Sequence, residues 1–271
     1  MMETETNTKL SDKAYWDEVL TNQKLPRVNT AANYNYKVTM DFVSDIFDDK
    51  VYKTFFEVGC GSSGWLPYFA QQYGLTVSGV DYSEVGCQIA QKNLQLLKIK
   101  YGEIICQDIF DPEWVKGRGY DVIFSYGVIE HFEKPQEIIR IFKSFTNPGG
   151  TIITLVPNLN GLNGWLTKYF MKEVYEMHRV ISKEQLRNYH ASNDLTDHKT
   201  RYAGTFSLTV IPWTNADRGI LRKGFFLRTI FLKSIFGFNL ILTSILRFLP
   251  DFPSRFFSPY VISVAKRPNQ V

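Results

Sequence analysis

Hydrophobic positions in the middle of the chain form short uninterrupted runs that alternate with longer segments of helical spacing. The uninterrupted runs predict strands at residues 53–60, 75–81, 101–108, 120–127 and 151–157, followed by two later strands at 203–211 and 260–266. The predicted helices are 11–20, 35–47, 64–74, 83–97, 135–145 and 182–190. Strands that alternate with helices in this way indicate βαβ units, and continuous apolar strands indicate a sheet covered on both faces. We therefore expect an α/β protein with a doubly wound, mostly parallel, seven-stranded sheet.

The same pattern divides the chain into four parts. We expect an N-terminal tail and helix at 1–33, a core at 34–211, a helical insertion at 212–257, and the final strand of the core with a tail at 258–271. The N-terminal residues are polar and include no apolar stretch of the kind that a secretory signal requires, so a cytoplasmic protein is expected.

The insertion has an unusual composition. Residues 218–250 include six basic residues and no acidic one, and residues 234–246 form an uncharged run of 13. Such a run is too short to span a bilayer, which takes about 20 residues. On a helical wheel one arc is polar and basic, with Asn239 among its members, and the opposite arc is rich in Ile and Phe, as in helices that lie in a membrane interface. We expect residues 219–250 either to contact a membrane surface peripherally, without crossing it, or to close as a lid over an apolar part of the ligand pocket; a dimer surface is the further alternative.

Composition and residue spacing argue against two further kinds of site. The 31 basic and 27 acidic residues leave a net charge of +4, too small an excess to indicate a nucleic-acid partner. The three cysteines form no C-x-x-C pair and the four histidines are dispersed, so the spacing typical of a zinc site is missing from the sequence.

A turn with the spacing G-x-G-x-x-G follows the first strand of the core, at Gly59, Gly61 and Gly64. Such turns let a ligand approach the backbone closely and often hold the pyrophosphate of a dinucleotide. Glu57, two residues before the first glycine, would repel a pyrophosphate, whereas it can face the ammonium group of S-adenosylmethionine. Asp81, at the end of the second strand, can accept from both ribose hydroxyls. The electrostatics favour S-adenosylmethionine; an NAD(P)-dependent oxidoreductase and a non-catalytic binding module are the alternatives.

Five segments of the core carry a resemblance to a known family. They are FEVGCGSSG, VSGVDYS, CQDIF, YDVIFSYGVIEHF and NPGGTIITLVPN. Their order and spacing within residues 36–158 resemble the successive motifs of class I S-adenosylmethionine-dependent methyltransferases, and of the quinone-precursor enzymes among them. The resemblance implies a Rossmann-like sheet whose last strand is antiparallel, and S-adenosyl-L-methionine as the cofactor. It also implies a transferase that methylates a small-molecule acceptor, which the apolar insertion predicts to be hydrophobic or lipid-linked.

The resemblance further assigns residues to the cofactor site, at the ends of four predicted strands. The methionine moiety is assigned to Glu57, Gly59, Gly61 and Gly64, and the ribose to Asp81 with Tyr82 beside it. The adenine is assigned to Asp108 and Ile109, and the pocket wall to Ser125 and Tyr126. Asp108 could instead cap the segment that follows it, but Asp111 fits that role better because it directly precedes Pro112.

The sulfonium donor is already activated by its positive charge, so much of the catalysis can come from holding the acceptor in line. A hydroxyl acceptor also requires a base, and His131 is the candidate, with Glu130 as a structural or orienting neighbour. The alternative is a histidine that only orients the following loop. Quinone-precursor O-methyltransferases carry E-x-x-E-H here and use it for a metal, whereas this chain has Gly127 in place of the first acid. No metal is therefore predicted.

Overall fold

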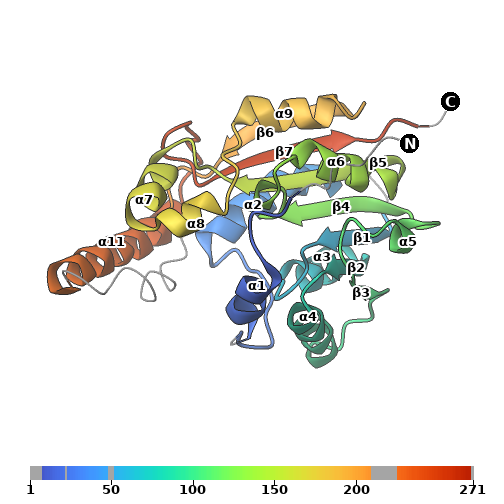
Figure 1. The fold of residues 1–271 in the computed structure, drawn as a ribbon, viewed down its shortest axis with the longest axis horizontal. Helices are drawn as coiled ribbons and strands as arrows, with labels where there is room; N and C mark the ends of the chain where they lie inside the picture. The colour runs from blue at the N-terminus through green and yellow to red at the C-terminus, as the bar shows by residue number, and fades with distance from the viewer. Residues whose placement is uncertain (1–7, 22, 48–51, 209–224, 270–271) are drawn as a thin grey trace.

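A computed structural model describes residues 8–21, 23–47, 52–208 and 225–269 of the chain. Its centre is a seven-stranded sheet with the strand order β3-β2-β1-β4-β5-β7-β6 (Figure 1). The strands are β1 Thr54–Val58, β2 Thr76–Asp81, β3 Ile104–Cys106, β4 Tyr120–Tyr126, β5 Thr146–Pro157, β6 Thr196–Ala203 and β7 Tyr260–Lys266. The first five run parallel, and β7 is antiparallel to both of its neighbours, β5 and β6. The predicted fold class and the antiparallel last strand are confirmed.

The helices connect these strands and cover the sheet. They are α1 Lys13–Leu20, α2 Tyr34–Phe47, α3 Trp65–Tyr73, α4 Glu84–Leu96, α5 Pro112–Val115, the 3-10 helix η1 Ile129–His131, α6 Pro135–Ser144, α7 Leu162–Phe170, α8 Lys172–Glu176, α9 Lys183–Ala191 and α11 Phe225–Leu246. Side-chain caps fix several starts, because Ser83 accepts from the Gly86 amide before α4 and Asp111 accepts from the Glu113 amide before α5. The predicted capping role of Asp111 is therefore confirmed.

Successive side chains of the central strands point to opposite faces of the sheet. Phe55 belongs to a buried cluster with residues of α2, α3 and α4, whereas Phe56 belongs to a second cluster with residues of α5, α6 and α9. The Phe55 ring is fully buried and lies 4.1 Å from the ring of Phe69 and 5.6 Å from that of Phe124. Because both faces are covered, the central strands are apolar throughout, which is the pattern that made them predictable.

The sixth strand lies elsewhere than the sequence predicts. A strand is expected at 203–211, but β6 ends at Ala203, residues 204–208 form no regular element, and 209–211 lie outside the described residues. β6 is the edge strand and pairs only with β7, so many of its side chains face water. Its sequence TDHKTRYA is accordingly polar and gives no apolar signal.

α11 extends away from the sheet beside α7 and α8 (Figure 1). Its packed side chains follow a helical stripe of Ile235, Asn239, Leu242 and Leu246. Asn239, expected on the solvent-facing polar arc, is instead fully buried, and its Oδ1 accepts from the Leu208 amide at 2.7 Å. The predicted division of the insertion into arcs is wrong at this position, because a backbone amide beside the helix requires an acceptor there.

The opposite side of α11 is apolar and exposed. Phe238 and Ile241, which the helical wheel places on the apolar arc, are 58% and 66% exposed. Within the residues that the structure describes, none of the helices combines the length and the hydrophobicity needed to cross a bilayer.

We expect Phe55→Ala to lower the free energy of unfolding by about 3–5 kcal/mol, because it leaves a cavity among Phe69 and Phe124 in the core. Phe238→Ala makes the same chemical change on the exposed side of α11 and should alter stability by no more than about 0.5 kcal/mol. Urea unfolding followed by circular dichroism measures both. Equal losses in the two variants would contradict the assignment of Phe55 to the core.

Candidate functional site

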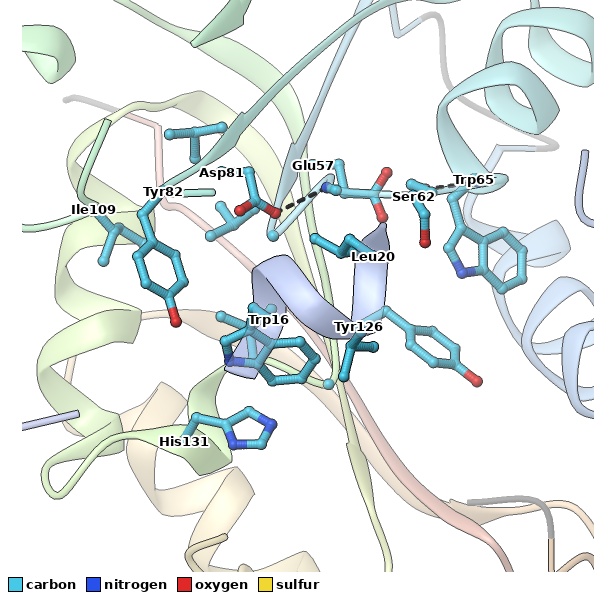
Figure 2. Close-up of a pocket in the computed structure, with 18 of the residues that line it drawn as sticks. Trp16, Leu20, Glu57, Ser62, Trp65, Asp81, Tyr82, Ile109, Tyr126 and His131 are labelled. Carbon is cyan, nitrogen blue, oxygen red and sulfur yellow. Dashed lines mark hydrogen bonds between the residues drawn. The ribbon is translucent and has the colours of Figure 1, made fainter. Parts of the chain in front are cut away.

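A cavity of about 280 Å³ opens where β1, β2 and β4 end, at the carboxyl edge of the sheet (Figure 2). Ligands of open α/β sheets bind at this edge. The structure brings most of the predicted site residues together around the cavity. They are Glu57, Gly59, Gly61, Gly64, Asp81, Tyr82, Asp108, Ile109, Tyr126 and His131.

Ser125 does not lie among the lining residues. It is fully buried in β4, between Val58 of β1 and Thr154 of β5, and its hydroxyl has no hydrogen-bond partner among the described residues. Tyr126, which follows it, does line the cavity and donates its hydroxyl proton to the Tyr260 hydroxyl at 2.7 Å. Because side chains alternate along a strand, the two neighbours cannot both face the same side. The expectation that Ser125 lines the pocket is therefore not supported.

Glu57 is the most unusual group of the site. Its side chain is buried, and burial raises the pKa of the carboxyl well above its ordinary value, against the lowering effects of a hydrogen bond with Ser63 and the charge of Arg27. The second carboxyl oxygen, Oε2, has no hydrogen-bond partner among the described residues. A buried polar atom without a partner is costly, so this oxygen marks a place for a ligand that brings a donor or a positive charge.

The glycine turn needs glycine for two physical reasons. Gly59 has φ +74°, a left-handed conformation that side chains rarely adopt, and a Cβ on it would lie 2.6 Å from a methyl carbon of Val128. A Cβ on Gly64 would lie 2.4 Å from the amide oxygen of Asn29, which places the segment before α2 directly against the turn. The turn is therefore a site of close approach, as the sequence predicts.

Asp81 is fixed by two backbone amides. Its Oδ2 accepts from the Gly61 amide at 2.8 Å (Figure 2). Its Oδ1 accepts from the Ser83 amide, also at 2.8 Å. Burial raises the pKa of this carboxyl, and the two amide bonds oppose that shift. Each oxygen keeps a further lone pair, so both can still accept from a pair of neighbouring hydroxyls.

The predicted adenine end of the cavity is closed by residues from the N-terminus. Asp108 accepts from the Phe110 amide at 3.1 Å and forms an ion pair with Lys9. The Lys9 ammonium also lies 4.5 Å from the centre of the Tyr82 ring. Ile109 is nearly buried and forms an apolar wall beside them.

The N-terminal segment, which the sequence pattern places outside the core, contributes side chains to the wall of the cavity. Trp16 and Leu20, one helical turn apart, project from α1 towards the cavity residues (Figure 2). A Cβ on Gly61 would lie 3.3 Å from the methyl carbons of Leu20, and the Trp16 ring meets the His131 ring edge to face at 5.1 Å. Arg27 also lines the cavity and is held there by the Tyr36 hydroxyl at 2.6 Å. In the sequence, the four-residue spacing of Trp16 and Leu20 is the one feature that indicates a shared apolar face on this helix.

His131 and Glu130 are both buried at the edge of the cavity. The Nδ1 of His131 lies 2.9 Å from the carbonyl oxygen of Met177, and burial lowers the pKa of the ring to about 3. Burial also raises the pKa of Glu130 to about 8, and its Oε2 has no partner among the described residues. The His178 ring lies 4.4 Å from that of His131, and burial lowers its pKa as well. The structure thus adds a second histidine that the sequence did not associate with the site.

With this geometry in view, comparison with known proteins is informative. Residues 31–200 match the family model of a methyltransferase domain, which is more than half of the chain, so the protein belongs to that family. The ubiquinone biosynthesis O-methyltransferase of Escherichia coli is 30% identical over 115 residues, which make up 42% of this chain and 46% of the relative. The chain thus spans less than half the length of the curated relatives it matches.

Solved structures show the same fold. The plantazolicin methyltransferase BpumL in complex with SAH is 21% identical, with a TM-score of 0.54 over 95% of this chain and 88% of that one. Phosphoethanolamine N-methyltransferase 2 of Haemonchus contortus in complex with S-adenosyl-L-methionine is 16% identical, with a TM-score of 0.53 over 85% of this chain and 52% of that one. At these identities the likeness establishes the architecture alone.

The protonation of Glu57 predicts a pH dependence of stability. The folded carboxyl has a raised pKa, so above pH ~4.5 the unfolded chain loses this proton while the folded chain keeps it. The unfolded state then binds fewer protons, and the contribution of Glu57 to the free energy of unfolding falls as pH rises, by up to about 1.4 kcal/mol per pH unit, until the folded pKa is reached. Glu57→Gln carries no such proton.

Urea unfolding of the protein and of Glu57→Gln at pH 5, 6 and 7 measures this effect. The stability of the natural protein minus that of the variant should decrease along the series, because the other titrating groups are shared and cancel in the difference. A difference that is constant or rises with pH would show that Glu57 is not held protonated by burial.

Proposed function

We propose that the protein transfers the methyl group of S-adenosylmethionine to a small-molecule acceptor. The observation that carries the proposal is the buried, unpartnered oxygen of Glu57 beside the glycine turn. The methionyl ammonium of the donor can satisfy this oxygen and stabilise the ionised carboxylate. Arg27, on the same cavity, offers a cation for the methionyl carboxylate, and Asp81 offers two acceptor oxygens for the ribose.

The amides of the glycine turn argue against a dinucleotide. The amides of Gly59 and Cys60 donate to the Val80 carbonyl, that of Ser63 donates to the Cys60 carbonyl, and that of Gly61 donates to Asp81. A turn that holds a pyrophosphate points its amides at the phosphates instead. These bonds therefore weigh against the alternative of an NAD(P)-dependent oxidoreductase.

The chemistry follows from the donor. An acceptor oxygen or nitrogen attacks the methyl carbon, the carbon–sulfur bond breaks, its electron pair stays on sulfur, and a hydroxyl acceptor also gives up its proton. His131 has a bare Nε2 for that proton, but with a pKa of about 3 the buried ring is a much weaker base than an ordinary histidine. Holding the acceptor in line is therefore the main contribution we assign to the cavity.

A large apolar outer face supports a hydrophobic acceptor. Among the described residues, every strongly exposed large apolar side chain except Leu96 belongs to α7, α11 or residues 248–257. Members of this outer face include Trp165, Tyr169, Phe238, Ile241, Ile245, Phe248, Phe252 and Phe256. The Leu162 amide donates to the Phe256 carbonyl, which joins the start of α7 to the segment after α11. Exposed apolar side chains that are concentrated in a few neighbouring elements in this way mark a site of association.

We assign this face to the surface of an anionic bilayer, with the rest of the protein in the cytoplasm. The six basic residues and the missing acids of 218–250 complement anionic headgroups, and the exposed Phe and Ile side chains can enter the interface. α8 leads from α7 to His178, beside His131 at the cavity edge.

The donor assignment predicts a clear preference in calorimetry. The protein should bind S-adenosylmethionine and give no comparable heat with NAD. Asp81→Ala should weaken donor binding about tenfold to a hundredfold, because each hydrogen bond to a charged group contributes roughly 1.5–3 kcal/mol. Asp111→Ala, which removes a cap of α5 outside the cavity, should leave donor affinity unchanged. Tight NAD binding without a response to S-adenosylmethionine would overturn the assignment.

The membrane assignment predicts salt-sensitive binding to vesicles. The protein should float with anionic vesicles at low salt, less so at high salt, and little with neutral vesicles, since each nearby Lys or Arg adds about 1 kcal/mol that salt screens. Phe238→Ser combined with Ile241→Ser should weaken binding more than tenfold, because burying each side chain contributes about 1.5–3 kcal/mol. Leu96→Ser changes an exposed apolar residue outside this face and should have no effect.

Light scattering without lipid distinguishes the remaining explanations. A dimer that the double substitution dissociates, in a protein that does not float, would assign the face to a second copy. A monomer that does not float with anionic vesicles even at low salt would leave a lid over the acceptor as the explanation of the apolar face. Either outcome would overturn the membrane assignment.

A further inference from the structure

Glu130, His131 and His178 converge at the edge of the cavity. Each can bring one ligand atom, a ring nitrogen or a carboxylate oxygen, to within 4.8 Å of the others. Glu130 and His131 belong to η1 after β4, and His178 follows α8, so the cluster is assembled from two separate parts of the chain. Of the three, His131 lines the cavity itself.

In the rings of His131 and His178 the same nitrogen, Nε2, is available to a ligand. The Nδ1 of His131 is 2.9 Å from the Met177 carbonyl, and the Nδ1 of His178 is 2.6 Å from the Val174 carbonyl. A carbonyl oxygen only accepts, so Nδ1 carries the proton in each ring and Nε2 carries the lone pair. Backbone carbonyls commonly fix metal-binding histidines in this tautomer.

The carboxylate completes the set. Glu130 is 1% exposed, and its Oε2 has no hydrogen-bond partner among the described residues. One possible ligand atom from each of the three residues lies within 4.8 Å of the others, and a cation is the group that can satisfy two ring nitrogens and an acidic oxygen together.

The backbone around the cluster is held firmly. The Arg179 amide donates to the Glu130 carbonyl at 2.6 Å, and the Arg179 guanidinium pairs with Glu133 at 2.9 Å. On the other side, the Leu10 amide donates to the His131 carbonyl at 2.8 Å. These bonds keep the two ligand-bearing segments together before any ion arrives.

We infer that Glu130, His131 and His178 form a binding site for one divalent transition-metal ion, with an open position towards the cavity. Two imidazoles and one carboxylate suit Zn²⁺ and its neighbours better than Mg²⁺ or Ca²⁺, which take mainly oxygen ligands. Ligands about 2 Å from a tetrahedral ion lie roughly 3.3 Å apart, so small side-chain rotations must close the present spacing.

The sequence predicted no metal because Gly127 stands where related enzymes have an acid. Gly127 has φ +71°, so the backbone there favours glycine, and the third ligand comes instead from His178. The site therefore differs in its donors from the one that the E-x-x-E-H pattern describes.

Binding of the ion does not depend on the proposed methyltransferase function, but the role of the ion in catalysis rests on it. A bound divalent ion would hold an acceptor oxygen at the cavity edge and lower the pKa of its hydroxyl. His131 would then hold the ion through Nε2 in place of acting as the base, and the lowered pKa would make a hydroxyl, rather than an amine, the methyl acceptor.

Cobalt titration of the tag-free, metal-stripped protein tests the site. Co²⁺ should bind once per chain with the visible absorption bands of a four- or five-coordinate ion, and Zn²⁺ should displace it. His178→Gln and Glu130→Gln should each lower the affinity about a hundredfold or more, beyond the 10–100-fold that losing a partner of a ligand costs. His198→Gln, at a histidine on β6 away from the cluster, should bind as the natural protein does.

S-Adenosylmethionine affinity, measured on the same samples, separates folding and function from the metal. His178 does not line the donor cavity, so His178→Gln should keep that affinity while losing the ion. Absence of the absorption bands in the natural protein, or equal bands in His178→Gln and His198→Gln, would overturn the metal site and leave the donor assignment intact.

Discussion

The central constraint on this protein is the carboxyl of Glu57, which lies buried at the end of β1 with one oxygen unpartnered. An ionised carboxylate in such a place is expensive, and the neighbouring negative charge of Asp81 adds to the cost. Burial therefore raises the pKa of the carboxyl and favours its protonated form. A ligand that carries an ammonium group and a sugar can pair its ammonium with Glu57 and its hydroxyls with Asp81. The electrostatics of these two residues therefore define the ligand better than the glycine spacing does.

The cavity is completed by a part of the chain that is not in the sheet. α1 and the residues around it supply Trp16, Leu20, Lys9 and Arg27, and a hydrogen bond from the Leu10 amide to the His131 carbonyl joins this segment to η1. The glycine turn and η1 therefore both contact the same short segment of the chain.

The acceptor side is built from a second group of elements. α7 and α11 pack together through a small apolar cluster and leave their other faces exposed, and α8 connects them to His178. The chain thus runs from the outer face through α8 to the histidine pair, and His131 of that pair lines the donor cavity. A hydrophobic acceptor with a hydroxyl group is the chemistry that would use all three.

Much of the fold could be predicted from the sequence because buried strands and helices have a local pattern of apolar residues. Strands covered on both faces are mostly apolar. Glu57 and Asp81 lie at the carboxyl ends of two such strands and the glycine turn follows the first, so their meeting at one edge could be predicted. β6 left no such record, since an edge strand needs only backbone pairing on one side and can remain polar. The alternation that turns Ser125 away from the cavity was readable in principle, but it depends on where the strand begins and on which side the ligand lies.

The contacts that defeated prediction join residues far apart in the chain. Periodicity puts Asn239 on a polar arc, yet the Leu208 amide that needs an acceptor there comes from a different segment. Likewise, nothing near His178 marks it as a partner of Glu130 and His131, because the carbonyl of Met177 and the amide of Arg179 bring the two segments together only after the chain has folded. Local sequence records which side chains avoid water; which polar groups satisfy one another is settled by long-range packing, where the pairing of each donor and acceptor depends on the whole fold.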